Sequence, residues 1–448
     1  MTAHRTSQID TALLEHDPAR GDQLMAHSDR ADAILHRVQV SPESLPSVRP
    51  GSNDWRWRVA MSAGVIAVAT VTAVVIGLVT VPGGHSVKGG HGTIAAPTWR
   101  LVSDVSPAWH VQQNSGYTPG FLPLSCPAST TCYALNITPG PTETSIEVTH
   151  DGGNTWQQLA LPDNLSGGPS LGCVDTSTCA MLGDDSGQPV FLETTDGGQT
   201  WSSHDGPSGL TSSEGMSGLV CTTATSCLAV PGDAVGDAAD AVAFVTTNGG
   251  TTWSTSAMPA GFSQFPQSLQ CTSTSDCVVS GAYESSAGAV SGAISYTTDG
   301  GSSWSMASVP AAINGWNAIS CWNPSNCLAV TSTLGGGATQ VLASSDSGAT
   351  WVNLDSTGLS NGFLSHLSCV DSSECWAAGR ARGGSAGIVG GVLASSSNGG
   401  QTFAEATVPQ GVGPVFNVSC PSATNCYALA SQNEQGGRSG LVLLAYGS

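Results

Sequence analysis

All 14 cysteines of the chain lie in pairs of the form Cys-x5-Cys, and no cysteine is left over. A complete set of evenly spaced pairs is typical of disulfide bonds formed in an oxidising compartment. A zinc site needs four converging ligands, and no second cysteine pair or histidine cluster lies at zinc-like spacing. Because each repeat contains one pair, we expect one local disulfide in each repeat. The pairs are Cys126/Cys132, Cys173/Cys179, Cys221/Cys227, Cys271/Cys277, Cys321/Cys327, Cys369/Cys375 and Cys420/Cys426.

Arginines form a second group of residues that could bind a ligand. Residues 59–448 contain only five Lys and Arg against 24 Asp and Glu. Three of the five, Arg380, Arg382 and Arg438, lie in the glycine-rich segments GRARGGSAG and QNEQGGRSG of neighbouring repeats. Guanidinium groups gathered on an acidic surface favour a binding site for a carboxylate or another anion. The alternative is that they are solvated arginines on glycine-rich loops.

Aromatic residues recur four to six residues before the first cysteine of a pair. Such rings would stack on a sugar or a peptide, and Trp316 and Phe416 are our candidate ligand contacts. The alternative is that the rings pack in the core between repeats. The residues are Phe121, Phe265, Trp316, Phe363 and Phe416.

Acidic and histidine clusters give no convincing metal site. Asp233, Asp237 and Asp240 lack the spacing and the closing carboxylate of an EF-hand, and His85 and His91 are spacers in a glycine-rich segment. We therefore expect neither a metal nor another cofactor.

The repeat itself indicates which elements position these residues. The cysteine pairs recur about every 47 to 51 residues, which is typical of closed or stacked arrays of small units. Within residues 121–161 the runs FLPLSC, CYALNI, SIEVTH and TWQQLAL read as four short strands. Four strands joined by tight turns predict an antiparallel blade in which the disulfide closes the first hairpin.

A second motif joins the third and fourth strands. Six of the seven cysteine pairs are followed by Thr/Ser-x-Asp/Asn-x-Gly-x-Thr/Ser-aromatic. The Asp or Asn and the hydroxyls would bond the turn backbone, Gly would take a positive φ, and the aromatic ring would pack between blades. The copies span residues 149–156, 194–201, 246–253, 297–304, 344–351 and 396–403.

This turn resembles the Asp-box (BNR) repeat of sialidases, sortilin-type receptors and propellers of the photosystem II assembly-factor type. The resemblance covers residues 96–448 and implies a β-propeller whose Asp boxes are structural and lie away from any active site. It therefore implies that Asp151, Asp196, Asp299 and Asp346 are not catalytic acids.

The ends of the repeat region predict how the ring closes. The seventh unit stops at LVLLAYGS, before a fourth strand, whereas Pro97–Leu101 matches the post-turn strand TWQQL. Donation of that strand would remove the exposed sheet edges. We expect an all-β, seven-bladed propeller over residues 97–448, closed by a strand at 98–102. The loops between second and third strands then share one end of the blades, opposite the cysteine turns and the Asp boxes.

Hydropathy separates the N-terminal region from the propeller. Val59–Val81 is a run of 23 uncharged residues, long enough for a transmembrane helix. Arg49, Arg56 and Arg58 precede it and only Lys88 follows closely, so the N-terminus is expected in the cytoplasm. A cleaved signal peptide is the alternative. We expect a partly disordered cytoplasmic tail (1–58), a helix (59–81), a flexible linker (82–96) and an extracytoplasmic propeller of a single-pass cell-membrane protein.

The residue inventory favours a binding or scaffold propeller over an enzyme. The resemblance implies that a sialidase-like site needs three converging arginines, a tyrosine nucleophile and an acidic proton donor. The region after the linker offers only Arg100, Arg380, Arg382 and Arg438. We expect recognition of a glycan, a cell-wall fragment or a protein; the alternatives are a glycoside hydrolase and a sensor that signals to a cytosolic partner through the tail. The acidic surface argues against nucleic acid.

Overall fold

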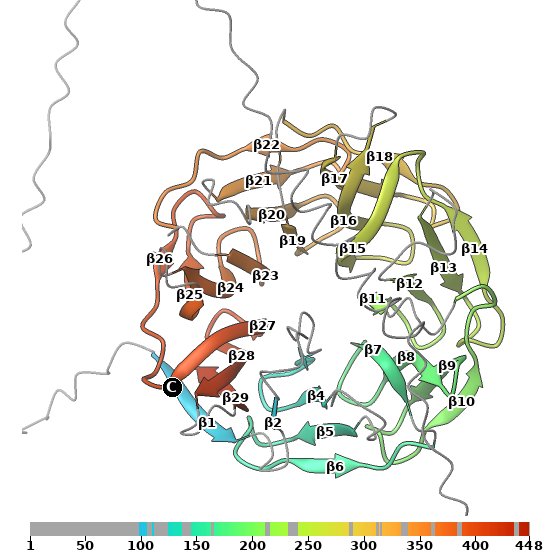
Figure 1. Cartoon of the computed structure of the whole chain (residues 1–448), viewed down its shortest axis with the longest axis horizontal. Helices are drawn as coiled ribbons and strands as arrows, with labels where there is room; N and C mark the ends of the chain where they lie inside the picture. The colour runs from blue at the N-terminus through green and yellow to red at the C-terminus, as the bar shows by residue number, and fades with distance from the viewer. Residues whose placement is uncertain are drawn as a thin grey trace, which may run out of the picture. The chain divides into compact units, whose positions relative to one another are not determined.

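The computed structural model shows a ring of seven antiparallel sheets around a central axis (Figure 1). It describes residues 98–447 except for 105–109, 112–123, 137–144, 163–164, 211–215, 232–240, 286–289, 311–312, 314–315, 333–338, 360–362, 383–387 and 434–438. The predicted tail, transmembrane helix and linker lie outside these residues. Within the described part, no helix is long and apolar enough to cross a membrane.

Each of blades 1 to 6 takes its four strands consecutively from the chain, running from the inside of the ring to the outside. The predicted seven-bladed propeller is therefore confirmed. Blade 1 contains β3 (Leu124–Ser125), β4 (Cys132–Asn136), β5 (Ser145–Thr149) and β6 (Gln157–Leu159); blade 2 contains β7 (Ser166–Cys173), β8 (Cys179–Asp185), β9 (Gln188–Thr194) and β10 (Ser202–Asp205); blade 3 contains β11 (Met216–Cys221), β12 (Cys227–Pro231), β13 (Val242–Thr246) and β14 (Ser254–Ala257).

The next blades follow the same order. Blade 4 contains β15 (Phe262–Cys271), β16 (Cys277–Glu284), β17 (Val290–Thr297) and β18 (Ser305–Met306); blade 5 contains β19 (Trp316–Cys321), β20 (Cys327–Ser332), β21 (Gln340–Ser344) and β22 (Val352–Asn353); blade 6 contains β23 (Phe363–Cys369), β24 (Cys375–Arg382), β25 (Ile388–Ser396) and β26 (Ala404–Glu405). Blade 7 combines β27 (Val412–Ser422), β28 (Asn425–Asn433) and β29 (Ser439–Tyr446) with β1 (Trp99–Asp104) and β2 (His110–Val111).

The seven predicted disulfides are all present, one in each blade. In blades 2 to 6 the two cysteines are directly opposite each other in the register of the first two strands, as in the pair Cys271↔Cys277. The bond thus closes the first hairpin at its turn, which the sequence analysis predicts.

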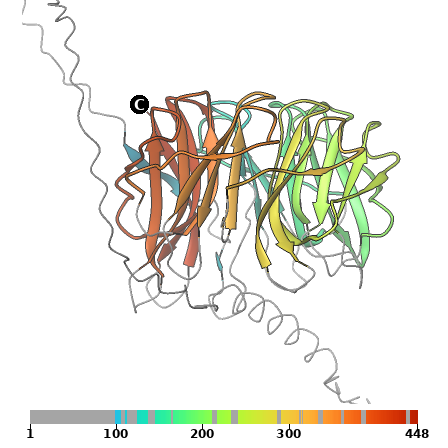
Figure 2. The ribbon, with the colours of Figure 1, turned by 90° about the horizontal axis from the view of Figure 1, so that it is seen from above.

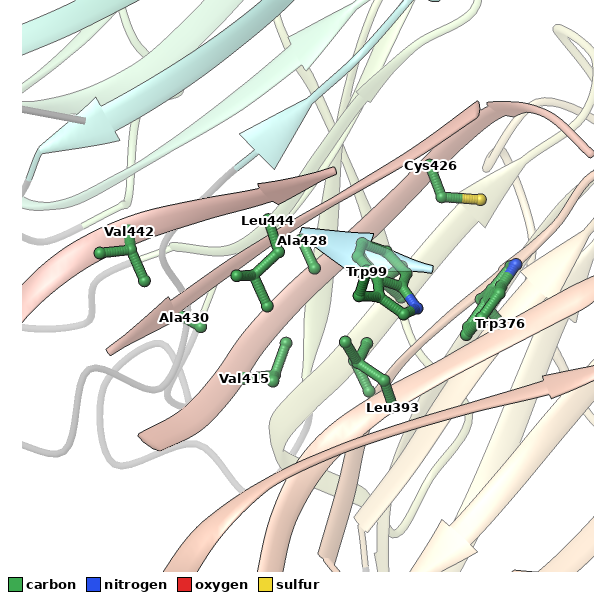
Figure 3. Packing of buried hydrophobic residues seen from close by; sticks show 11 residues of the cluster. Trp99, Trp376, Leu393, Val415, Cys426, Ala428, Ala430, Val442 and Leu444 are labelled. Atoms are coloured by element: carbon green, nitrogen blue, oxygen red, sulfur yellow. The ribbon is translucent and has the colours of Figure 1, made fainter. Parts of the chain in front are cut away.

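Blade 7 is completed by a strand from the beginning of the described chain. β1 pairs antiparallel with β29, with Trp99 opposite Tyr446, so the blue and red ends of the ring meet in one sheet (Figure 1). This is the edge where the sequence analysis places its closing strand. Trp99 is buried between blades 6 and 7, where its ring meets Trp376 at a centroid distance of 5.0 Å (Figure 3).

The hydrophobic core consists of seven clusters, each between two adjacent blades. The aromatic residue after each Asp/Asn turn packs against the preceding blade, as Trp304 does against blade 3. Trp99 occupies the corresponding place for blade 7. Seen from the side, the strands run between two ends of the ring (Figure 2). We call the end with the cysteine turns the turn end and the opposite one the loop end.

Candidate functional site

Carboxylates of the Asp turns at the turn end accept hydrogen bonds from residues of their own turns. The Thr149 hydroxyl donates to Asp151 (2.8 Å) and accepts the Gly153 amide (2.8 Å), while the Thr155 hydroxyl donates to Asp151 (2.6 Å). The same pattern recurs in the next turns, where a side-chain hydrogen bond from Thr200 lowers the pKa of Asp196 to about 2 and one from Ser303 lowers that of Asp299 to about 2. These acids stay ionised and hold the turn. Their geometry fits a structural role.

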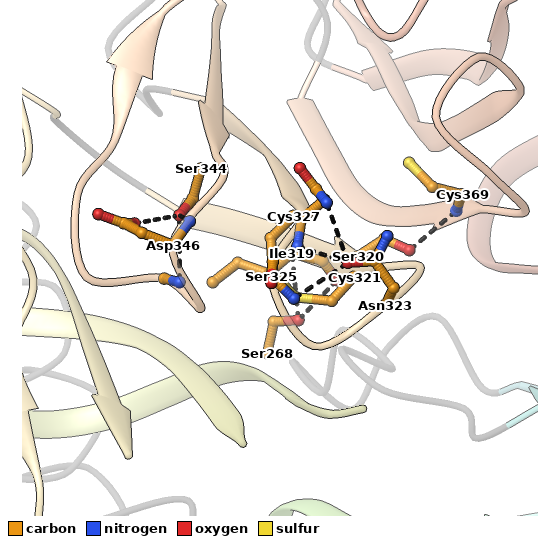
Figure 4. The surroundings of a disulfide bond; sticks show 12 residues. Ser268, Ile319, Ser320, Cys321, Asn323, Ser325, Cys327, Ser344, Asp346 and Cys369 are labelled. Atoms are coloured by element: carbon orange, nitrogen blue, oxygen red, sulfur yellow. Dashed lines mark hydrogen bonds between the residues drawn. A yellow bond between two sulfur atoms is a disulfide. The ribbon is translucent and has the colours of Figure 1, made fainter. Parts of the chain in front are cut away.

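The cysteine turns are capped by a residue that the sequence analysis did not single out. The side chain two positions after the first cysteine accepts backbone amides, as Asn323 does from Ser325 (3.0 Å) and Asn326 (2.9 Å) (Figure 4). A recurrent Asx or Ser/Thr turn residue at this position was the available clue. The capping residues are Asp175, Thr223, Ser273, Asn323 and Asp371.

Further hydrogen bonds connect these turns with each other. The amide of Ser347 donates to the carbonyl of Ser325 (3.0 Å), and the corresponding bond recurs in blades 1 to 6. Between blades, the Ser320 hydroxyl accepts the Cys369 amide at 2.8 Å (Figure 4), and Ser368 accepts that of Cys420 at 3.0 Å. The polar groups of the turn end thus serve the fold, and a ligand site is better sought at the loop end.

Arg380 is the outstanding charged residue at the loop end of blade 6. It lies near the end of β24, opposite Phe363 at the start of β23, and its guanidinium stacks over the Phe363 ring at 5.6 Å from the centroid. The side chain is half-buried. Burial lowers the pKa of this guanidinium below its usual range, and no carboxylate of the described residues offsets that effect.

The register shows that Arg380 lies on the face of blade 6 that packs against blade 7. Ala378, two residues before it, belongs to the cluster shared with Val415 of β27. Across the next strand pair, Gly391 is opposite Arg380, and a Cβ at Gly391 would approach Val415 to 2.7 Å. β27 therefore lies close against this face, on which Arg380 stacks over Phe363.

His366 lies on the same face, deeper along β23. Its cross-strand partner is Ala378, and its Nδ1 lies 3.4 Å from the Ser365 hydroxyl. Burial lowers the pKa of His366 to about 4, so the imidazole is neutral at pH 7. Sequence reasoning missed this residue because a lone histidine in an inner strand carries no motif.

Of the other candidate ligand contacts, only Phe416 has a described side chain. Arg382 ends β24 and Trp316 begins β19, but the structure describes neither side chain; Arg438 lies outside the described residues. Phe416 is only 6% exposed and packs between blades 7 and 1 with Leu124 and Tyr427. Its burial fits the core alternative rather than a ring offered to a ligand.

Arg100 lies at the other end of the ring. It lies on β1, the outermost strand of blade 7, opposite Ala445 of β29. The next residue of β29, Tyr446, is opposite Cys426, and this places Arg100 at the turn end. Arg100 and Arg380 therefore do not converge on one substrate. Among the described residues, no group of three or more His, Cys, Asp or Glu is arranged to hold a metal ion.

Comparison with known proteins establishes the fold alone. The sequence matches no protein-family model and no curated protein. The structure of YCF48 bound to D1 peptide aligns with 80% of this chain and 96% of its own, at 16% identity and a TM-score of 0.51. A GH74 xyloglucanase from Xanthomonas campestris aligns with 76% and 54%, at 13% identity and a TM-score of 0.47.

A third solved structure, Trypanosoma rangeli sialidase, aligns with 66% of this chain and 56% of its own, at 15% identity and a TM-score of 0.41. By their names, these neighbours include one protein that holds a peptide and two glycosidases. A shared fold does not select among such functions. What the comparisons establish is that this chain is similar in architecture to the YCF48 β-propeller.

Proposed function

We propose that this protein is a membrane-anchored, extracytoplasmic binding propeller that holds a carboxylate-bearing ligand at the loop end of blade 6. The observation that carries the proposal is the half-buried Arg380, stacked on Phe363 at 5.6 Å and without an ion pair to any described carboxylate. A partly desolvated charge is unfavourable until it is paired. A ligand carboxylate would supply the pairing through two parallel hydrogen bonds.

The ligand that we favour is a peptide with a free carboxylate. The YCF48 propeller was solved with a peptide bound, and this supports a peptide as a ligand class for the architecture. Arg382, the last residue of β24, and Arg438, which follows β28 in the sequence, belong to the same proposal. Trp316, at the inner edge of blade 5, is proposed as a stacking contact.

Two further assignments in the proposal rest on the sequence. We assign the six Asp/Asn turns to the Asp-box type on their motif, and residues 59–81 as the membrane anchor on their length and lack of charge. The formal net charge of −20 repels acidic ligands in general. Selectivity would then come from local arginines, which act only on an anion that reaches them.

A binding array tests the proposal. Full-length protein in detergent is applied to peptides with free or amidated C-termini, acidic glycans and cell-wall fragments. We expect free carboxylates to be retained and their amidated counterparts to be lost. Equal retention of both forms would exclude a carboxylate site. The hydrolase alternative predicts turnover of fluorogenic glycosides that carboxylate substitutions abolish, and such turnover would replace the proposal.

A further inference from the structure

Arg380 and His366 form a pair of basic groups on one surface between blades 6 and 7. Both face blade 7, since Arg380 and Ala378 alternate on β24 and His366 is opposite Ala378. In a regular antiparallel pair such diagonal neighbours lie about 7–8 Å apart, and here a register shift between Leu364 and His366 inserts one residue into β23 between the two levels. A carboxylate that pairs with Arg380 on this face would therefore lie on the same side of the sheet as the imidazole.

The strands around this pair contribute no acidic side chain. β23 carries His366 as its only titrating group, because its cysteine is in a disulfide, and β24 carries Arg380 and Arg382. Neither β25 nor β27 contains a charged or titrating residue, and Tyr427 of β28 packs toward blade 1. These five strands therefore contribute no carboxylate to this surface.

We propose that His366 makes ligand binding at Arg380 pH-sensitive: a bound carboxylate stabilises the protonated imidazole, so the ligand is held more tightly as pH falls. This inference rests on the carboxylate site proposed above. The sign follows from linkage. A nearby anion raises the pKa of His366 from about 4. The affinity for the anion therefore rises as pH falls from the His366 pKa of the bound protein to that of the free protein. For a carboxylate about 7 Å from the imidazole, the effect is about one pKa unit, or about tenfold in affinity.

The test measures the His366 titration directly in the full-length protein. The ten histidines are labelled with 13C, and their NMR signals are followed from pH 3.5 to 7.5. The probe is sodium trifluoroacetate, a carboxylate that stays ionised over this range, with sodium chloride at equal ionic strength as the control. The signal that disappears in both His366→Gln and His366→Asn is assigned to His366.

We expect trifluoroacetate to raise the pKa of His366 by about one unit, chloride to leave it unchanged, and Arg380→Gln to remove the effect. Thermal stabilisation by trifluoroacetate, compared between the parent and Arg380→Gln, reports binding independently. Stabilisation that depends on Arg380 with an unchanged His366 titration would overturn the coupling and leave the carboxylate site standing. Absence of Arg380-dependent stabilisation at both pH 4.5 and pH 7 would overturn the site and the coupling together.

Discussion

Replacement of Trp99 by Ala tests whether the closing strand holds the ring together. Trp99 is 5% exposed, and its ring lies 5.0 Å from Trp376 and 5.6 Å from Tyr446. Truncation of a buried tryptophan costs about 3–5 kcal/mol, and aromatic partners place the loss toward the upper part of that range. We expect a loss of about 4 kcal/mol, which for a domain of about 350 residues lowers Tm by about 5 °C.

The same strand provides a matched control. Leu101 lies two residues further along β1 and is 43% exposed, so Leu101→Ala should change stability by less than about 0.5 kcal/mol. Both variants are compared with the parent by thermal unfolding followed by circular dichroism, with the disulfides intact. A Trp99→Ala variant as stable as Leu101→Ala would refute the burial of this strand in blade 7.

Three further predictions follow from the packing. The pKa of His366 is about 4 in the folded protein against 6.5 for the free side chain, so the unfolded chain takes up this proton first as pH falls. The parent should therefore lose about 2 kcal/mol more than His366→Gln between pH 7 and pH 4.5 in urea unfolding; parallel losses would contradict the assignment. Replacing Cys271 and Cys277 together by Ala should cost about 2 kcal/mol without unfolding the ring, and non-reducing peptide mapping should find every bond within one pair, so a bond between blades would be decisive against it. A protein that starts at residue 106 lacks β1 and should aggregate in size-exclusion chromatography, whereas one that starts at 94 should be monomeric; equal Tm values for the two would exclude the closing role of β1.

Features that depend on neighbours in the chain were predictable from the sequence. The Asp/Asn turn is built by contacts from a residue to the fourth residue after it, as between Asp151 and Thr155, so its motif suffices to predict it. The disulfides join cysteines six positions apart, and the repeat makes local pairing the economical choice. The cap at Asn323 had an equally local basis, and its recurrence at the same position of the turns of blades 2 to 6 would have identified it.

Features that depend on how far along a strand a side chain lies, and on which blade it faces, were not predictable from the sequence. Phe416 lies four residues before its cysteine and Phe363 six residues before its own, a difference of about 7 Å along a strand. Phe416 is therefore buried between two blades, whereas Phe363 lies near the loop end beneath Arg380. Spacing alone treated the two rings as equivalent. The shared face of Arg380 and His366 likewise follows from a register shift between Leu364 and His366, for which the sequence gives no sign.

The most direct test of the account measures the affinity of a carboxylate peptide, selected on the array, for two charge-matched variants. Arg380→Gln removes the half-buried guanidinium at the loop end, and Arg100→Gln removes an exposed one at the turn end. Isothermal titration calorimetry at pH 6 should show affinity reduced about 10- to 100-fold for Arg380→Gln and nearly unchanged for Arg100→Gln, with equal Tm values. Equal affinity of the two variants would contradict the claim that Arg380 binds the ligand.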